Sequence, residues 1–168
     1  MKKYLVIGIG NVVLSDDGIG PYVVRRAEEL LSNLKEYVDY KENYSGGFDL
    51  IYDIAGYDKV LIVDSILTGT CEPGICITCT SADFDQLKSD RLIDSHGINL
   101  PTIIETGRRC GYKMPEEMVI FGIESEDVTT FSEHLTEKVE ACIDDIVLRI
   151  EETLSIWTEQ KLSILESQ

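Results

Sequence analysis

Residues 4–20 decide the fold, and they read Tyr4-Leu5-Val6-Ile7-Gly8-Ile9-Gly10-Asn11-Val12-Val13-Leu14-Ser15-Asp16-Asp17-Gly18-Ile19-Gly20. The apolar run at residues 4–9 predicts a buried strand, and the glycines after it predict a turn. Residues 18–33 then carry apolar side chains at intervals of three and four, which predicts a helix. A strand that turns directly into a helix is typical of an α/β domain with a largely parallel sheet.

The rest of the chain continues this alternation of short apolar runs and helix-period segments. We expect further strands at residues 37–40, 59–63, 75–80 and 118–123, and helices at residues 48–55, 100–110 and 135–157, with a helical turn at residues 82–88. These elements predict a single α/β domain over residues 1–157. We expect residues 158–168 to form a C-terminal extension that frays.

Composition excludes several classes of function. The chain has 168 residues, with 31 Asp and Glu against 15 Lys and Arg, and a formal net charge of −16 at pH 7. Such an acidic chain lacks a broad basic surface for nucleic acid, and an anionic membrane would repel it. No apolar run approaches the roughly 20 residues that a membrane span needs. Five cysteines at irregular spacing do not indicate a disulfide framework, so we expect a cytoplasmic protein. We expect a monomer, because no strongly apolar surface helix is left over once the sheet is covered.

The glycine-rich turn does not predict a dinucleotide site. A dinucleotide fingerprint needs a third glycine three residues after Gly10, and Val13 stands there. Asp16 and Asp17 would also repel a phosphate at the start of the following helix. The two acids either cap that helix, which negative charge at its N-terminus stabilises, or serve a functional site.

Two further residues converge with Asp17 on one edge of the predicted sheet. Asp64 follows the predicted strand at residues 59–63, and the carboxyl ends of parallel strands meet at one edge. His96 lies in a polar loop before a helix. Taken singly, each is an ordinary capping or loop residue. Together, Asp17, Asp64 and His96 suit a divalent metal such as zinc or nickel, or a water for hydrolysis.

The remaining cysteines and histidine predict little chemistry. Cys76 and Cys79 are three residues apart on a predicted strand, so their side chains point to opposite faces and cannot share a metal. We interpret these two, with Cys110 and Cys142, as small and mostly buried side chains. Cys71 lies in a loop, where a thiol–imidazole pair with His96 is a minor alternative. His134 is expected at the surface.

Four motifs in order resemble the hydrogenase maturation endopeptidases, from Met1 to about residue 150. They are the Gly-x-Gly-Asn-x-x-x-x-Asp-Asp-Gly-x-Gly stretch, then Val63-Asp64, Ser95-His96-Gly97-Ile98-Asn99-Leu100-Pro101 and Phe121-Gly122-Ile123-Glu124. The resemblance implies a phosphorylase/hydrolase-like α/β/α sandwich of three layers with a five-stranded mixed sheet. It also implies that Asp17, Asp64 and His96 contact metal. One departure is the stretch 42–47, where relatives often carry an Asp-Gly-Gly-Thr-like loop and this chain reads Glu42-Asn43-Tyr44-Ser45-Gly46-Gly47.

The resemblance implies a specific reaction. Such proteases remove a C-terminal extension from the precursor of the large subunit of nickel–iron hydrogenase, once nickel has been inserted. We therefore expect Asp17, Asp64 and His96 to engage the nickel of that precursor, and Asp17 or Asp64 to activate a water. Another divalent metal could occupy the same ligands. The alternative is a non-catalytic chaperone that binds nickel or the precursor through them, while the acid pair disfavours a phosphorylase-type enzyme.

Overall fold

The computed structural model describes residues 3–83 and 99–166. Within them, one sheet has the strand order β2-β1-β3-β5-β4. Its strands are β1 (Tyr4–Ile9), β2 (Val38–Asn43), β3 (Lys59–Ile66), β4 (Cys76–Thr80) and β5 (Glu117–Glu124). Strands β2, β1, β3 and β5 run parallel, and β4 pairs antiparallel with β5. The expected mixed sheet is confirmed.

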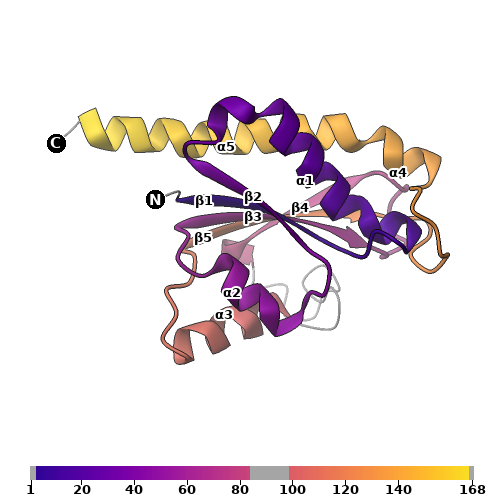
Figure 1. Ribbon diagram of the computed structural model, residues 1–168, viewed down its shortest axis with the longest axis horizontal. Coiled ribbons are helices and arrows are strands. Elements are labelled where there is room, and N and C mark those ends of the chain that lie inside the picture. The colour runs from indigo at the N-terminus through magenta and orange to yellow at the C-terminus, as the bar shows by residue number, and fades with distance from the viewer. Residues whose placement is uncertain (1–2, 84–98, 167–168) are drawn as a thin grey trace.

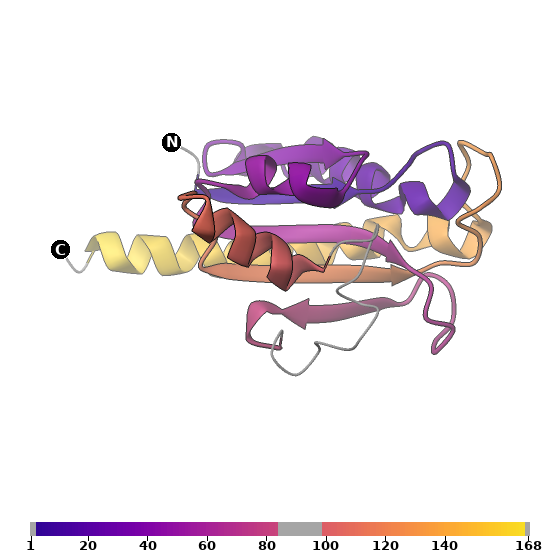
Figure 2. The same cartoon turned by 90° about the horizontal axis from the view of Figure 1, so that it is seen from below.

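Helices cover both faces of the sheet. They are α1 (Ile19–Leu30), α2 (Leu50–Ile54), α3 (Leu100–Arg109), α4 (Glu137–Ala141) and α5 (Ile143–Glu166), with 3-10 turns η1 (Ser15–Gly18), η2 (Ser32–Leu34), η3 (Gly47–Asp49) and η4 (Ser81–Asp83). Figures 1 and 2 show α1 and α5 on one face and α2 and α3 on the other. The three-layer α/β/α sandwich is therefore confirmed. In the described part of the chain, no helix combines the length and the apolar character needed to cross a membrane.

Alternation along the strands divides the apolar side chains between two cores. In β1, Tyr4 and Val6 face the layer of α1 and α5, while Leu5 and Ile7 face the layer of α2 and α3. Each fully buried aliphatic side chain stabilises the fold by about 1.5–3 kcal/mol. Trp157 of α5 closes the first core, and the hydroxyl of Tyr4 donates a hydrogen bond to its carbonyl oxygen at 2.9 Å. Strand β1 is thus buried on both faces, between the two cores.

Some element boundaries differ from the sequence prediction. Strand β3 continues to Ile66, so Asp64 lies inside the strand near its end instead of after it. Strand β2 likewise continues to Asn43. The first helix is preceded by the 3-10 turn η1, and neither Asp16 nor Asp17 caps it with a side-chain hydrogen bond. Both acids do lie in the first turn of η1, where negative charge is favourable, so the expectation of capping fails only for a side-chain hydrogen bond.

The predicted helix at residues 135–157 consists of two helices, α4 and α5, separated at Cys142. The backbone N–H of Cys142 donates to the carbonyl of Val139 at 3.3 Å, a tighter connection than an α-helix makes. The Cys142 thiol reaches the same carbonyl at 3.0 Å. At the other end α5 continues to Glu166, past residue 157 where we expected the domain to end. Fraying of the last residues stays a prediction.

Candidate functional site

The carboxyl ends of β1, β3 and β5 lie at one edge of the sheet, on the right in Figures 1 and 2. The segments that follow these strands, residues 10–18, 67–75 and 125–136, gather at this edge. The predicted convergence of the first loop with the end of the third strand is therefore present. Ligands of open α/β sheets bind at such an edge.

Two glycines of the opening motif allow the first loop and α1 to approach the sheet closely. A Cβ on Gly20 would collide with the backbone carbonyl oxygens of Ile9 and Val63. Gly10 has a φ of +146°, and a Cβ there would collide with the carbonyl oxygen of Asp17. The glycines therefore serve the close packing of η1 and α1 against β1 and β3, which a side chain would prevent.

This packing brings Asp17 to the end of β3. The hydroxyl of Ser65 donates to Oδ1 of Asp17 at 3.0 Å, and the backbone N–H of Asn11 donates to Oδ2 at 2.8 Å. The backbone N–H of Ser65 donates to Oδ1 of Asp64 at 2.8 Å. Asp17 is 9% exposed and Asp64 3%. Ser65 therefore joins the two carboxylates, and sequence reasoning missed this role even though Ser65 directly follows Asp64.

Asp16 has a different role from its neighbour Asp17. Its carboxylate accepts four hydrogen bonds: from the backbone N–H groups of Glu126, Asp127 and Thr136 at 2.9, 3.0 and 2.7 Å, and from the hydroxyl of Thr136 at 2.9 Å. Its side chain is fully buried. Asp16 therefore fastens the segment 125–136, which follows β5, to the first loop.

Glu124, the last residue of β5, fastens the loop after β3. Its Oε1 accepts from the backbone N–H groups of Thr68 and Gly69 at 2.8 and 2.7 Å, and its Oε2 accepts from the Thr68 hydroxyl at 2.6 Å. Burial and the negative charge of Glu124 raise the pKa of the neighbouring Cys71 thiol. A raised pKa disfavours the thiolate, which weakens the minor alternative of a thiol–imidazole pair.

The loop after β2 departs from the family pattern but is well organised. Oδ1 of Asn43 accepts from the backbone N–H groups of Ser45 and Gly46 at 3.1 and 2.6 Å, and its amide donates to Asp53 at 2.7 Å. The carbonyl of Asn43 accepts from the N–H of Gly10 at 3.1 Å. Asn43 therefore ties this loop to the turn that follows β1.

His96 lies outside the described residues, so its placement relative to Asp17 and Asp64 stays a prediction. Within residues 3–83 and 99–166, no three or more His, Cys, Asp or Glu side chains form a group that could hold a metal ion. Asp17 and Asp64 are the described donors, and two carboxylates become a donor set suited to a divalent metal such as nickel or zinc only when an imidazole joins them. A buried carboxylate can also act as a general base toward water.

The cysteines outside the site are mostly as expected. Cys76 packs against the core under α1 and α5, whereas Cys79 belongs to the core under α2 and α3, so they do face opposite sides of the sheet. Cys110 is exposed, which corrects the expectation that it is buried; it lies directly after the end of α3. His134 is exposed, as predicted.

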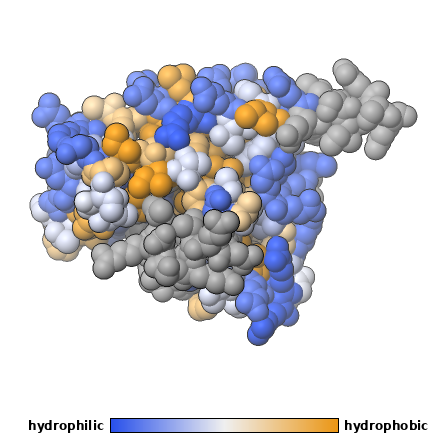
Figure 3. Space-filling model, turned by 180° about the vertical axis from the view of Figure 1, so that it is seen from behind, coloured by the Kyte–Doolittle hydropathy of each residue, from blue (hydrophilic) through white to orange (hydrophobic). Residues whose placement is uncertain are grey.

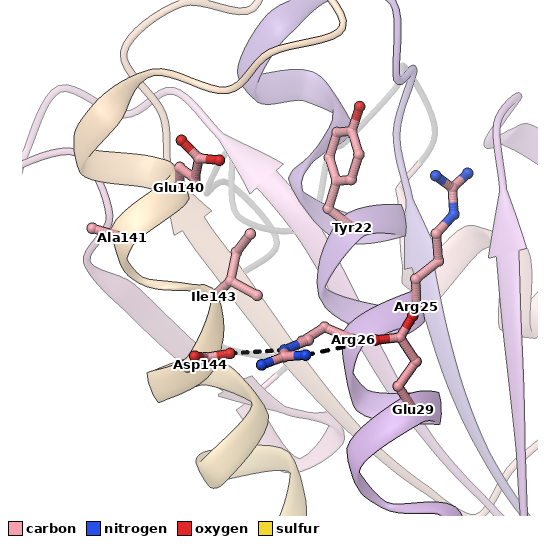
Figure 4. A pocket seen from close by; sticks show the side chains of 8 residues that line it. All are labelled: Tyr22, Arg25, Arg26, Glu29, Glu140, Ala141, Ile143 and Asp144. Atoms are coloured by element: carbon pink, nitrogen blue, oxygen red, sulfur yellow. Dashed lines mark hydrogen bonds and ion pairs between the residues drawn. The ribbon is translucent and has the colours of Figure 1, made fainter.

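A separate shallow pocket lies between α1 and the α4–α5 region, and it includes none of the site carboxylates (Figure 4). Its positive charges are already paired. Arg26 contacts Asp144 at 3.0 Å and Glu29 at 3.6 Å. Arg25 makes two hydrogen bonds of 2.8 Å to Glu42. The pocket therefore offers no uncompensated charge to an anionic ligand.

Comparison with known proteins gives a consistent result. A family model described as hydrogenase maturation protease matches residues 23–153. The hydrogenase 2 maturation protease of Escherichia coli is 28% identical over 142 residues, which cover 84% of each chain. A putative hydrogenase maturation protease of Methanocaldococcus jannaschii is 26% identical over 152 residues, 87% of this chain and 92% of that one.

Solved structures agree with the sequence comparisons. The hydrogenase maturating endopeptidase HybD from E. coli superposes with a TM-score of 0.75 at 25% identity, over 92% of this chain and 93% of that one. A hydrogenase 2 maturation peptidase from a Thaumarchaeota archaeon gives a TM-score of 0.65 at 28% identity, over 92% and 99% of the two chains.

Proposed function

This chain belongs to the hydrogenase maturation protease family, and from that premise we propose that it removes the C-terminal extension from the nickel-loaded precursor of a nickel–iron hydrogenase large subunit. As a member of a protease family, it is a hydrolase that acts as an endopeptidase. Our proposal concerns the identity of the substrate and the role of nickel in its recognition.

One observation carries the proposal: two buried carboxylates, Asp17 and Asp64, are joined through Ser65 at the edge of the sheet. We assign both to contact with the nickel that the precursor already contains, together with His96. The metal then belongs to the substrate, and contact with it makes cleavage depend on completed insertion. Both carboxylates and an imidazole are suitable ligands for nickel.

The same carboxylates supply the chemistry of hydrolysis. Asp17 or Asp64 accepts a proton from a water as the water oxygen attacks the carbonyl carbon of the scissile peptide. The C–N bond then breaks, and the proton passes to the leaving amine. Burial of both acids keeps bulk water away and strengthens their electrostatic effect on the reacting atoms. The Ser65 hydroxyl, 3.0 Å from Asp17, orients one of the two acids.

The test is incubation of the purified chain with its nickel-loaded precursor, followed by measurement of the intact mass of the precursor. We expect the loss of one C-terminal peptide. Asp64→Asn and His96→Ala should each abolish cleavage while circular dichroism shows a folded protein. Asp145→Asn, an exposed change on α5, is the matched control and should cleave normally.

Two outcomes would contradict the proposal. A precursor that is bound with unchanged mass indicates the chaperone alternative, in which the same ligands hold nickel without cutting. A variant at Asp17, Asp64 or His96 that cleaves at the wild-type rate removes that residue from the site.

A further inference from the structure

Exposed apolar side chains surround the edge at which Asp17 and Asp64 lie. They are Val13 in the first loop, Tyr44 and Phe48 after β2, Leu67 after β3, Ile75 directly before β4, and Phe131 after β5, and we call this set the apolar rim. Phe131 is 85% exposed. Seen from behind, apolar side chains gather in the half of the molecule away from the C-terminal end of α5 (Figure 3). An apolar patch that borders a site is typical of an interaction surface.

Hydrogen bonds hold Phe131 in its exposed position. The N–H of Ser132 donates to the carbonyl of Val13 at 3.0 Å, and the N–H of Ser15 donates to the carbonyl of Ser132 at 2.8 Å. This bridge attaches the residue next to Phe131 to the loop that carries Val13 and leads into Asp17. Upstream, the N–H groups of Thr129 and Thr130 donate to Asp127 at 2.9 and 3.0 Å. Phe131 is therefore presented by a fixed loop.

The neighbouring part of the rim is held through Glu124. Its carboxylate fixes the N–H groups of Thr68 and Gly69, directly after Leu67. Its own backbone N–H donates to the carbonyl of Ile75 at 2.9 Å. The loops that carry these apolar side chains are therefore ordered before any partner arrives, which lowers the entropic cost of binding.

The negative charge beside the apolar rim indicates which kind of partner the rim can bind. Residues 125–137 contain Glu126, Asp127, Glu133 and Glu137 and no lysine or arginine. With a formal net charge of −16 for the chain, anionic membranes and nucleic acids are repelled. A polypeptide that combines apolar side chains with lysine or arginine matches both the rim and the acids beside it.

We propose that the apolar rim is the docking surface for the precursor polypeptide, that it binds an apolar segment flanked by basic residues, and that Phe131 is its central contact. This inference rests on the proposed function, because it names how the same substrate is held. The rim is continuous with the loops of the carboxylate site, so a chain docked there lies beside Asp17 and Asp64. Aromatic side chains, phenylalanine among them, are enriched at the centre of protein–protein interfaces.

The test separates docking from metal recognition by calorimetric titration with nickel-free and with nickel-loaded precursor. Phe131→Ala should weaken the binding of both precursors by the same factor, about tenfold, which corresponds to about 1.4 kcal/mol. Leu148→Ala, the matched control on the outer face of α5 with 57% exposure, should bind like the wild type. Asp64→Asn should weaken only the binding of the nickel-loaded precursor.

A kinetic measurement provides a second readout. Phe131→Ala should raise KM about tenfold and leave kcat within about twofold, because the residue contributes to binding and not to the reaction. Glu133→Lys should also raise KM, whereas Glu151→Lys on α5 should not. A lower kcat with unchanged KM would contradict the docking role.

Failure of the docking inference differs from failure of the proposed function. If the wild type binds the precursor without cutting it, the proposed function fails and the affinities still test the rim. The rim inference is overturned if Phe131→Ala and Leu148→Ala bind the precursor equally, or if the wild type does not bind it. It is also overturned if sedimentation shows a wild-type dimer that Phe131→Ala converts to monomer, since a second copy would then occupy the rim.

Discussion

Asp16 and Asp17 are adjacent in the sequence, yet their side chains lie in different surroundings. Asp17 meets Ser65 at the end of β3. Asp16 points to the segment after β5, where it accepts four hydrogen bonds from residues 110 to 120 positions away. Adjacent acids can diverge in this way because η1 turns the chain by about 120° per residue.

Removal of the Asp16 carboxylate should destabilise the protein strongly. Asp16→Ala leaves the partly buried N–H groups of Glu126, Asp127 and Thr136 without their acceptor, and hydrogen bonds to charged groups contribute about 1.5–3 kcal/mol each. We expect a loss of about 3–5 kcal/mol and a fall in Tm of about 10 °C, measured by circular dichroism. Asp145→Ala, at an exposed position, should change stability by about 0.5 kcal/mol or less. Equal melting temperatures for the two variants would contradict this role for Asp16.

At the scale of elements, the position of α1 against β1 and β3 assembles the site. The approach is close enough for a Cβ at Gly20 to meet two backbone carbonyls, of Ile9 in β1 and Val63 in β3. Neither carbonyl can move without disturbing the sheet. The glycine motif thus sets the distance between α1 and the strands, and with it the meeting of Asp17 and Ser65.

Gly20→Ala should therefore lower stability, although the same change in an open helix raises it by about 1 kcal/mol. The added methyl group forces α1 away from the sheet, and overpacking of this kind costs about 1–3 kcal/mol. Thermal unfolding measures the effect, with Glu28→Ala at an exposed position of the same helix as the control. A Gly20→Ala protein that melts at a higher temperature than the wild type would show that the helix does not approach so closely.

Strands and helices could be predicted from the sequence where the pattern of apolar residues is local. The continuous apolar run Tyr4–Ile9 reflects a strand buried on both faces, and the three-to-four spacing in α5 reflects a helix that buries one face, so both strand and helix could be identified. The break at Cys142 was missed because the apolar spacing continues across it. Likewise, Asp64 and Asp17 were predictable from strand ends, whereas the roles of Ser65 and Asp16 depend on contacts 48 to 120 residues apart.

For the whole molecule, the excess of acids is the dominant electrostatic feature. Acidic residues outnumber basic ones by 31 to 15, and much of the basic side-chain charge lies in surface ion pairs such as Lys113–Asp58 and Lys138–Glu72. Such exposed pairs contribute about 0–1 kcal/mol each. We therefore expect repulsion among the remaining acids to outweigh the ion pairs.

Salt should consequently stabilise the protein at pH 7. An increase in ionic strength from about 0.01 to about 0.1 M shortens the Debye length from about 30 to about 10 Å and screens the repulsion between acids on the surface. We expect Tm, followed by circular dichroism in sodium chloride, to rise by a few degrees. A Tm that falls over this range would show that the ion pairs contribute more than the repulsion costs.

In the proposed function, the chain cuts its precursor only after nickel has been inserted, through the site of Asp17 and Asp64. The most direct measurement is the intact mass of matched nickel-loaded and nickel-free precursors after incubation with the wild-type protein and with Asp64→Asn. We predict that only the nickel-loaded precursor loses a C-terminal peptide, and only with the wild-type protein. Cleavage of the nickel-free precursor at the same rate, or cleavage by Asp64→Asn, would contradict the account.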